Sequence, residues 1–122
     1  LLITADTIVI LNDGVLEKPA DYDHAFEMLK ALSGKMHQVI TGVCLSSGKK
    51  SVVFSSLTNV QFKDLTDTEI DYYISNFEPY DKAGAYGIQE WIGSIGISHI
   101  EGSFYNVMGL PLQKLYEEIQ KF

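Results

Sequence analysis

Cysteine is almost absent from this sequence, and long apolar runs are missing. Cys44 is the only cysteine among 122 residues, so no disulfide can form within the chain. A chain without disulfides suits a reducing compartment, and we therefore expect it in the cytoplasm. No apolar stretch reaches the roughly 18 to 20 residues that cross a bilayer. The opening Leu1-Leu2-Ile3 lacks a basic segment, so the sequence predicts neither a membrane anchor nor a signal peptide.

Positive charge is also scarce. Nine Lys and Arg residues stand against 16 Asp and Glu, which gives a formal net charge of −7. Proteins that hold nucleic acid neutralise its phosphates with clustered cations, so we expect no nucleic acid polymer as a partner. A small anion remains compatible with this charge. A few placed lysines and backbone N–H groups can bind phosphate, especially with a divalent cation between them.

The size of the chain predicts a single domain. Its 122 residues, 46% of them apolar, can form one ordinary core. The sequence contains no internal repeat, low-complexity tract or linker, so we predict one domain over residues 1–122. The chain opens without Met and directly on a strand pattern, from which we expect the natural chain to begin further upstream.

Hydrophobic periodicity predicts strands that alternate with helices, and hence an α/β fold. Apolar and β-branched runs predict strands at 1–10, 39–45, 52–62 and 93–100, of which the middle two form a hairpin. Helical spacing and capping signals predict helices from Asp21 to Ser33, from Thr66 to Pro79, briefly within 80–89, and after Pro111. We interpret the aromatic pairs Tyr72-Tyr73 and Phe104-Tyr105 as core rather than as base-stacking surfaces.

Asp6 is the first candidate for chemistry, because it interrupts the apolar strand at Thr4-Ala5-Asp6-Thr7. A carboxylate at the end of a central strand is costly unless it is paired, bound to a metal or placed in a cleft. An Asp that caps a turn would give the same pattern. The residues alone leave both interpretations open.

Three further polar residues have the chemistry to hold a phosphate or a nucleobase. Lys18 precedes a helix whose N-terminus favours anions, and Lys82 lies in the small-residue segment 81–89. The alternatives are an ordinary surface lysine for Lys18 and an ion pair with Asp81 for Lys82. Gln89 offers both a donor and an acceptor to the edge of a base, which is a weak signal by itself.

Other common kinds of site find no support in the sequence. His24, His37 and His99 are too dispersed for a pair of metal ligands at helical spacing, and we assign them no catalytic role. The sequence has no phosphate-binding glycine loop, no dinucleotide-binding glycine fingerprint and no serine hydrolase elbow.

A set of short motifs, taken together and in order, resembles the Maf family of nucleoside triphosphate pyrophosphatases. The resemblance spans essentially the whole chain, and its two most specific parts are the blocks Asp81–Gln89 and Asn106–Pro111. The other parts are Ala5-Asp6-Thr7, Glu17-Lys18-Pro19, Leu32-Ser33-Gly34, Thr41-Gly42, Glu78-Pro79 and Glu101-Gly102.

The resemblance implies a fold, an activity and a set of site residues. The fold is α/β, with a mixed central sheet flanked by helices and a cleft between two lobes, as in inosine triphosphatases. The activity is attack of water on the α–β phosphate linkage of a nucleoside triphosphate, with Mg²⁺ or Mn²⁺ as cofactor. Asp6 corresponds to the general base and is a metal ligand, Lys18 and Lys82 correspond to lysines that contact the triphosphate, and Thr7 and Gln89 correspond to positions associated with substrate choice.

The resemblance also bears on the substrate and on assembly. Ala-Asp-Thr together with Ile-Gln is similar to the branch that acts on dTTP and UTP rather than on 7-methyl-GTP. These residues do not decide among dTTP, UTP, CTP and modified pyrimidine nucleotides. A homodimer is compatible with the family, in which dimers are frequent, although the sequence offers no interface.

One departure from the family pattern lies at the start of the chain. Family members begin with a loop that carries Ser and Arg and later supply a Glu that helps to hold metal, and this segment has no counterpart before Leu1. We therefore expect an N-terminally truncated fold whose phosphate clamp is incomplete. Electrostatic positioning supplies much of the catalysis in phosphate chemistry, so we expect this chain to be weak or inactive as given.

Two other hypotheses compete with the enzyme. A regulator of cell division and septum formation would bind nucleotides or partners without turning them over. A folded fragment would have no activity of its own, and an exposed strand edge at Leu1–Ile10 would favour oligomers. Hydrolysis that depends on Asp6 separates the enzyme from both.

Overall fold

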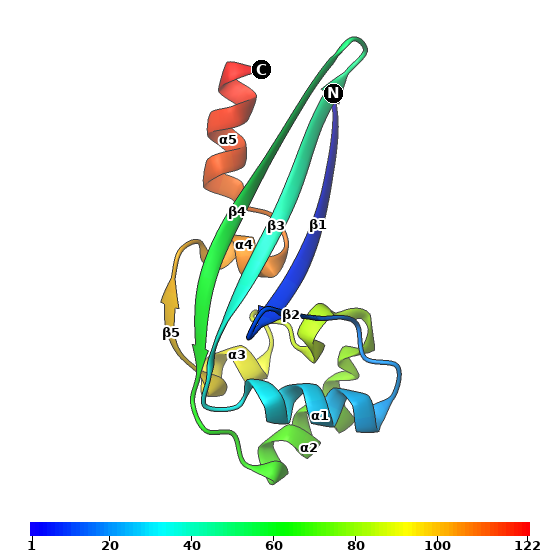
Figure 1. Cartoon of the computed structure of the whole chain (residues 1–122), viewed down its shortest axis with the longest axis vertical. Helices are drawn as coiled ribbons and strands as arrows, with labels where there is room; N and C mark the ends of the chain where they lie inside the picture. Colours follow the sequence, from blue (N-terminus) through cyan, green and yellow to red (C-terminus); the bar gives the residue numbers. More distant parts are fainter.

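The computed structural model describes residues 1–122 as a long twisted sheet with helices packed against it (Figure 1). The sheet has the order β2-β1-β3-β4-β5, and every neighbouring pair of strands is antiparallel. The strands are β1 (Leu2–Leu11), β2 (Gly14–Leu16), β3 (Met36–Ser47), β4 (Lys50–Phe62) and β5 (Ile97–Glu101). The helices are α1 (Tyr22–Leu32), α2 (Asp67–Phe77), the short 3-10 turns η1 (Pro79–Asp81) and η2 (Ala83–Ala85), α3 (Trp91–Gly96), α4 (Phe104–Met108) and α5 (Leu112–Lys121).

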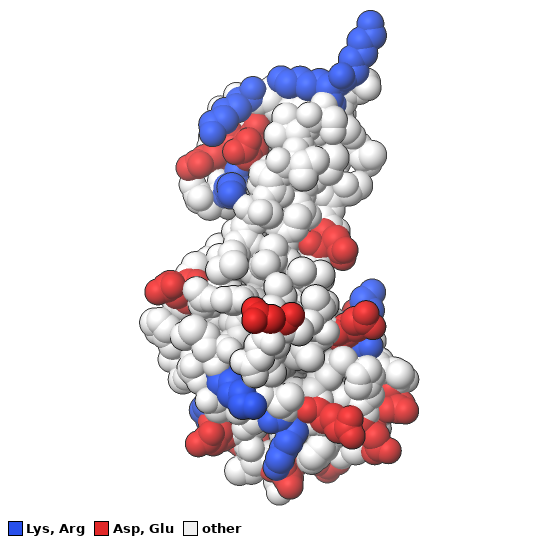
Figure 2. Space-filling view, in the orientation of Figure 1, with Lys and Arg blue, Asp and Glu red and all other residues white.

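The expected α/β class, with a central sheet flanked by helices, is confirmed, but the sheet is antiparallel rather than mixed. The reason is the short strand β2, which runs antiparallel to β1. Helix α1 then carries the chain back, so that β3 starts in the direction of β2 and also runs antiparallel to β1. The shape is elongated. A helix-rich lobe holds α1, α2 and α3, and a narrower lobe holds the tip of the β3–β4 hairpin beside α5 (Figures 1 and 2).

Helices α1 and α2 confirm the capping signals read from the sequence. The Asp21 side chain accepts a hydrogen bond from the His24 backbone N–H and so starts α1. Thr66 and Glu69 form a reciprocal capping box that starts α2. The apolar faces of both helices pack into one core cluster with the sheet. No helix of the structure is long and apolar enough to span a membrane.

The two faces of the sheet are unlike. Along β3 the alternate residues from His37 to Leu45 are buried against helices, while the residues between them are exposed or half-buried. On β1 only Val9 is buried and the other residues are exposed or half-buried, so residues 1–10 do not form a core strand with a polar break. The cause lies in the pairing. β2 covers only Val9–Leu11, and the rest of β1 pairs with β3 on one side alone.

Two local predictions are wrong, and one helix was not foreseen. The segment predicted as one strand at 93–100 forms helix α3 before β5 begins at Ile97. Within this helix the backbone of Gly93 lies so close to Ile88 that a side chain would meet the Ile88 carbonyl oxygen. The helix that was not foreseen is α4. Of the aromatic residues interpreted as core, Tyr73 is buried, whereas Tyr72, Phe104 and Tyr105 are exposed.

Candidate active site

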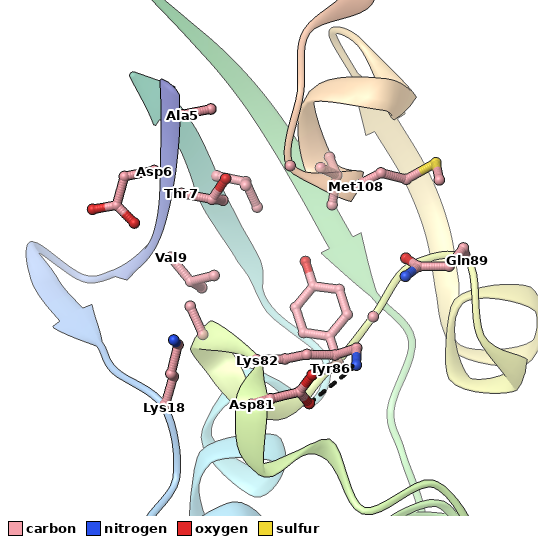
Figure 3. Close-up of a pocket in the computed structure, with 15 residues that line it drawn as sticks. Ala5, Asp6, Thr7, Val9, Lys18, Asp81, Lys82, Tyr86, Gln89 and Met108 are labelled. Atoms are coloured by element: carbon pink, nitrogen blue, oxygen red, sulfur yellow. Dashed lines mark hydrogen bonds and ion pairs between the residues drawn. The ribbon is translucent and has the colours of Figure 1, made fainter. Parts of the chain in front are cut away.

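One cavity brings together all five candidate residues from the sequence (Figure 3). It has a volume of about 240 Å³ and lies between β1, the turns at 81–89 and the end of α4. Small-molecule sites usually measure roughly 300 to 1,000 Å³, so a larger ligand would extend beyond this cavity. Its wall includes Asp6, Thr7, Lys18, Lys82 and Gln89.

Asp6 and Thr7 are neighbours on β1, so their side chains point to opposite faces of the sheet. Thr7 pairs with Thr41 on the helix-covered face, whereas Asp6 pairs with Gly42 and is exposed. Figure 3 shows the Asp6 carboxylate pointing away from Thr7. The carboxylate lies in the middle of a strand, so the alternative of a turn cap is wrong. Its exposure also means that no ion pair or metal is needed to offset burial.

Lys82 lies between two carboxylates. Its Nζ is 3.2 Å from Asp81 and 4.0 Å from Glu90, and 26% of its side chain is exposed. The hydrogen bond from Lys82 lowers the pKa of Asp81 below its usual range. The fully buried Tyr73 donates to Glu90 at 2.6 Å and accepts from the Gly87 N–H at 3.0 Å. The sequence analysis named an ion pair between Lys82 and Asp81 as an alternative, and the structure contains it. This ion pair holds the Lys82 ammonium beside the cavity.

All fixed positive charge at this site comes from lysine, because the chain contains no arginine. Lys18 follows β2, and Figure 3 shows its ammonium rising into the cavity from the side opposite Gln89. Lys18 and Lys82 are the only lysines in the cavity wall. They can contact an anion as point charges but cannot clamp it with the two-pronged geometry of a guanidinium.

Gln89 and Tyr86 line the wall that continues toward α3. Figure 3 shows the Gln89 amide pointing toward the cavity, where it can both donate and accept. The Tyr86 hydroxyl lies 2.6 Å from Nε2 of His37. Burial lowers the pKa of His37 to about 4, so its imidazole is neutral near pH 7. His37 thus belongs to the packed core beneath the cavity.

Sequence reasoning missed four residues that support the cavity. Tyr73 and Glu90 hold Lys82, as described above. Thr41 contacts Thr7, with 2.8 Å between their Oγ1 atoms, and donates to the backbone carbonyl of Asn106 at 3.1 Å. A signal was present for Thr41, since a hydroxyl at an inward position of an apolar strand requires a partner.

No group of three or more His, Cys, Asp or Glu side chains is close enough to hold a metal ion. Asp6 and Asp81 are the carboxylates of the cavity wall. A divalent cation such as Mg²⁺ commonly keeps several waters and takes one or two carboxylates plus phosphate oxygens. The exposed carboxylate of Asp6 has the chemistry of one such protein ligand.

Comparison with known proteins gives consistent matches. The family model described as Maf-like protein matches residues 1–122. A dTTP/UTP pyrophosphatase of Parabacteroides distasonis is 61% identical over 122 residues, which cover 100% of this chain and 63% of that protein. One of Porphyromonas gingivalis is 57% identical over 122 residues, covering 100% of this chain and 61% of that protein.

A more distant example comes from Cytophaga hutchinsonii. Its dTTP/UTP pyrophosphatase is 54% identical over 121 residues, which cover 99% of this chain and 56% of that protein. The chain therefore spans about three fifths of the length of the curated relatives it matches.

Proposed function

The chain belongs to the Maf-like protein family over its whole length, and on this premise we propose that it is part of a nucleotide pyrophosphatase. The substrates are dTTP and UTP, which are hydrolysed to the monophosphate and pyrophosphate. The relatives whose names state this activity are 53% to 61% identical to the chain. Modified pyrimidine nucleotides are a second group of proposed substrates.

The observation that carries the proposal is that Thr7, Lys18, Lys82 and Gln89, from distant parts of the sequence, line one cavity, with Asp6 beside Thr7 on the cavity-lining part of β1. The two lysines supply positive charge suited to phosphate, and the hydroxyl and the amide supply polar groups suited to a nucleoside. The cavity residues are Asp6, Thr7, Lys18, Lys82 and Gln89.

Each residue has a role within the proposal. Asp6 is the general base, because its exposed carboxylate can take a proton from an attacking water. Lys18 and Lys82 bind the triphosphate and offset charge on its oxygens. Thr7 and Gln89 contact the nucleoside. The carboxylates of Asp81 and Glu90 keep Lys82 extended along the cavity wall.

A divalent cation, Mg²⁺ or Mn²⁺, is part of the proposal, with Asp6 as the residue of this chain that would hold it. Such a cation supplies charge neutralisation to the phosphates when bound. The chain offers too few carboxylates at the cavity to hold it without substrate.

The cellular setting and the assembly are two further parts of the proposal. Cys44 is free and half-buried, which suits a reducing compartment such as the cytoplasm. A homodimer is the proposed assembly. Light scattering would test this assembly, and a monodisperse monomer in solution would contradict the proposed dimer.

The test of function is pyrophosphate release from a panel of nucleoside triphosphates with Mg²⁺ or Mn²⁺. This chain, a version extended to the length of the relatives and its Asp6→Asn variant are compared. We expect the extended protein to release pyrophosphate from dTTP and UTP, the variant to lose this activity and the chain alone to be weak. Nucleotide binding without release by the extended protein would favour the non-catalytic regulator. Full activity of the chain alone would contradict the expectation that its phosphate-binding residues are incomplete.

A further inference from the structure

A short chain of hydrogen bonds runs inward from the cavity through two hydroxyl groups. Oγ1 of Thr7 lies 2.8 Å from Oγ1 of Thr41, and Thr41 in turn lies 3.1 Å from the backbone carbonyl oxygen of Asn106. Thr41 and Asn106 are fully buried, with 0% exposure. Thr7 is half-buried and forms part of the cavity wall.

The direction of these hydrogen bonds follows from counting protons. A hydroxyl group has one proton to donate, and a carbonyl oxygen can only accept. The proton of Thr41 therefore goes to the Asn106 carbonyl. Thr41 must then accept from Thr7, so the single proton of Thr7 points inward, away from the cavity. Toward the cavity, Thr7 has only lone pairs to present.

The end of this chain of hydrogen bonds is fixed in place. The nitrogen of the Asn106 side-chain amide lies 3.2 and 3.0 Å from the carbonyl oxygens of Val39 and Ser56 and 3.0 Å from Oγ1 of Thr58, so its two protons are shared among three acceptors. These contacts tie α4 to both central strands of the sheet. The Asn106 carbonyl therefore cannot turn away from Thr41 without breaking buried hydrogen bonds.

We propose that Thr41 and Asn106 are positioning residues that make the Thr7 hydroxyl a hydrogen-bond acceptor for the nucleoside of the substrate. The proposal rests on the proposed function. Phosphate oxygens are acceptors too, so Thr7 excludes them and favours binding in which the phosphates lie at Lys18 and Lys82. The substrate group that meets Thr7 must therefore be a hydrogen-bond donor, and the donors of a pyrimidine nucleoside are neutral.

Two donors are common to the substrates named for the relatives. Uracil and thymine both carry a ring N3–H, where cytosine has an acceptor nitrogen. The sugars of UTP and dTTP share a 3′-hydroxyl. Either donor fits the lone pairs of Thr7, and the two are separated by assay with CTP and with 3′-deoxy-UTP.

The test is the ratio of kcat/KM values in the full-length protein, for UTP against CTP and for UTP against 3′-deoxy-UTP. In one of these two ratios the wild type should strongly favour UTP, since a site built to accept from a donor rejects an analogue that lacks it. Thr41→Val frees the Thr7 proton, so Thr7 can donate as well as accept. We expect that ratio to fall by about tenfold in Thr41→Val and to be kept in Thr41→Ser, which retains the hydroxyl.

Ser33→Ala is the control. The Ser33 hydroxyl is partly buried, accepts from the Leu65 backbone N–H at 2.7 Å and contacts none of Thr7, Thr41 and Asn106. We expect it to lower the melting temperature while leaving both ratios unchanged. Thr41→Val and Ser33→Ala that behave alike in both ratios would overturn the proposal, as would a wild type without preference in either ratio.

Failure of the proposed function has a different signature. In that case the full-length wild type neither hydrolyses any triphosphate nor binds a non-hydrolysable UTP analogue, and this inference falls with it. Hydrolysis with ratios that do not respond to Thr41→Val overturns the role of Thr41 and Asn106 alone.

Discussion

The hydroxyl of Tyr73 donates a hydrogen bond of 2.6 Å to Glu90, the carboxylate that lies 4.0 Å from the ammonium of Lys82. The ring of Tyr73 belongs to the core of the helix-rich lobe, so the position of a cavity lysine is linked to core packing. Burial, followed by the bond to Glu90, raises the pKa of Tyr73, and the hydroxyl stays protonated and able to donate.

Tyr73→Phe should destabilise the chain by about 1 to 3 kcal/mol, because it leaves the Gly87 N–H and the Glu90 carboxylate without their buried partner. Urea unfolding followed by circular dichroism measures the change. Tyr72→Phe is the control, since Tyr72 precedes it in α2 but is 49% exposed. Equal unfolding midpoints for the two variants would contradict the role given to the Tyr73 hydroxyl.

Gly87→Ala should lower the affinity for nucleotide and have a smaller effect on the free energy of unfolding. An added Cβ would lie 2.8 Å from both Oε1 of Glu90 and Cε of Lys82, so the two side chains must move apart. Calorimetric titration with a non-hydrolysable UTP analogue tests this in the full-length protein. Gly14→Ala, whose Cβ meets only the Leu11 carbonyl at 3.4 Å, should bind as the wild type does. Unchanged affinity in Gly87→Ala would show that the placement of Lys82 is not needed for binding.

Stability should fall as the pH is lowered from about 6.5 toward 4 because of His37. Burial lowers its pKa from 6.5 to about 4, so the unfolded chain binds a proton over this range and the folded chain does not. This part of the free energy of unfolding is fully present above pH 6.5. It is lost as the pH falls from 6.5 toward 4, and the loss reaches about 3 kcal/mol at the lower pH. Urea unfolding at pH 7, 6 and 5 measures it.

The control for the pH prediction is a pair of histidine variants. His37→Gln should remove this part of the pH dependence, whereas His99→Gln, at an exposed position, should retain it. A pH profile shared by both variants and the wild type would assign the loss of stability to carboxylates instead.

Asn106→Ala should destabilise the chain by roughly 2 to 4 kcal/mol, since two buried acceptors and one partly buried acceptor on β3 and β4 lose their donor. Differential scanning calorimetry measures the loss. The matched change Asn76→Ala removes an amide that donates to the Tyr72 carbonyl at an exposed site, and it should have little effect. Similar losses in the two variants would mean that Asn106 does not tie α4 to the sheet.

Much of the fold followed from local signals in the sequence. The Asp21 cap, the Thr66–Glu69 capping box and the two long strands of the hairpin were read correctly because each rests on neighbouring residues. Helix α3 was missed because Gly93 and the β-branched residues around it resemble a strand. The start of α3 also carries no capping signal, since its N-cap residue Glu90 makes no side-chain capping hydrogen bond.

The candidate site also divides into residues that the sequence identified and residues that it did not. The resemblance to a family identified five cavity residues, and the structure places them together. Thr41, Tyr73 and Glu90 were not found, because their roles come from partners 17 to 65 residues away along the chain. The direction of a hydrogen bond depends on those distant partners and cannot be derived from residue types alone.

The opposite orientation of Asp6 and Thr7 also governs how β1 can align on β3. A shift of one residue along β3 would turn Asp6 toward the buried Thr41 and expose Thr7 and Val9. A charged carboxylate is less favourable on the helix-covered face than the half-buried Thr7 hydroxyl that it would replace, so the charge proposed to serve catalysis also disfavours the shifted alignment. Asp6→Asn would weaken this preference for the native alignment of β1 on β3.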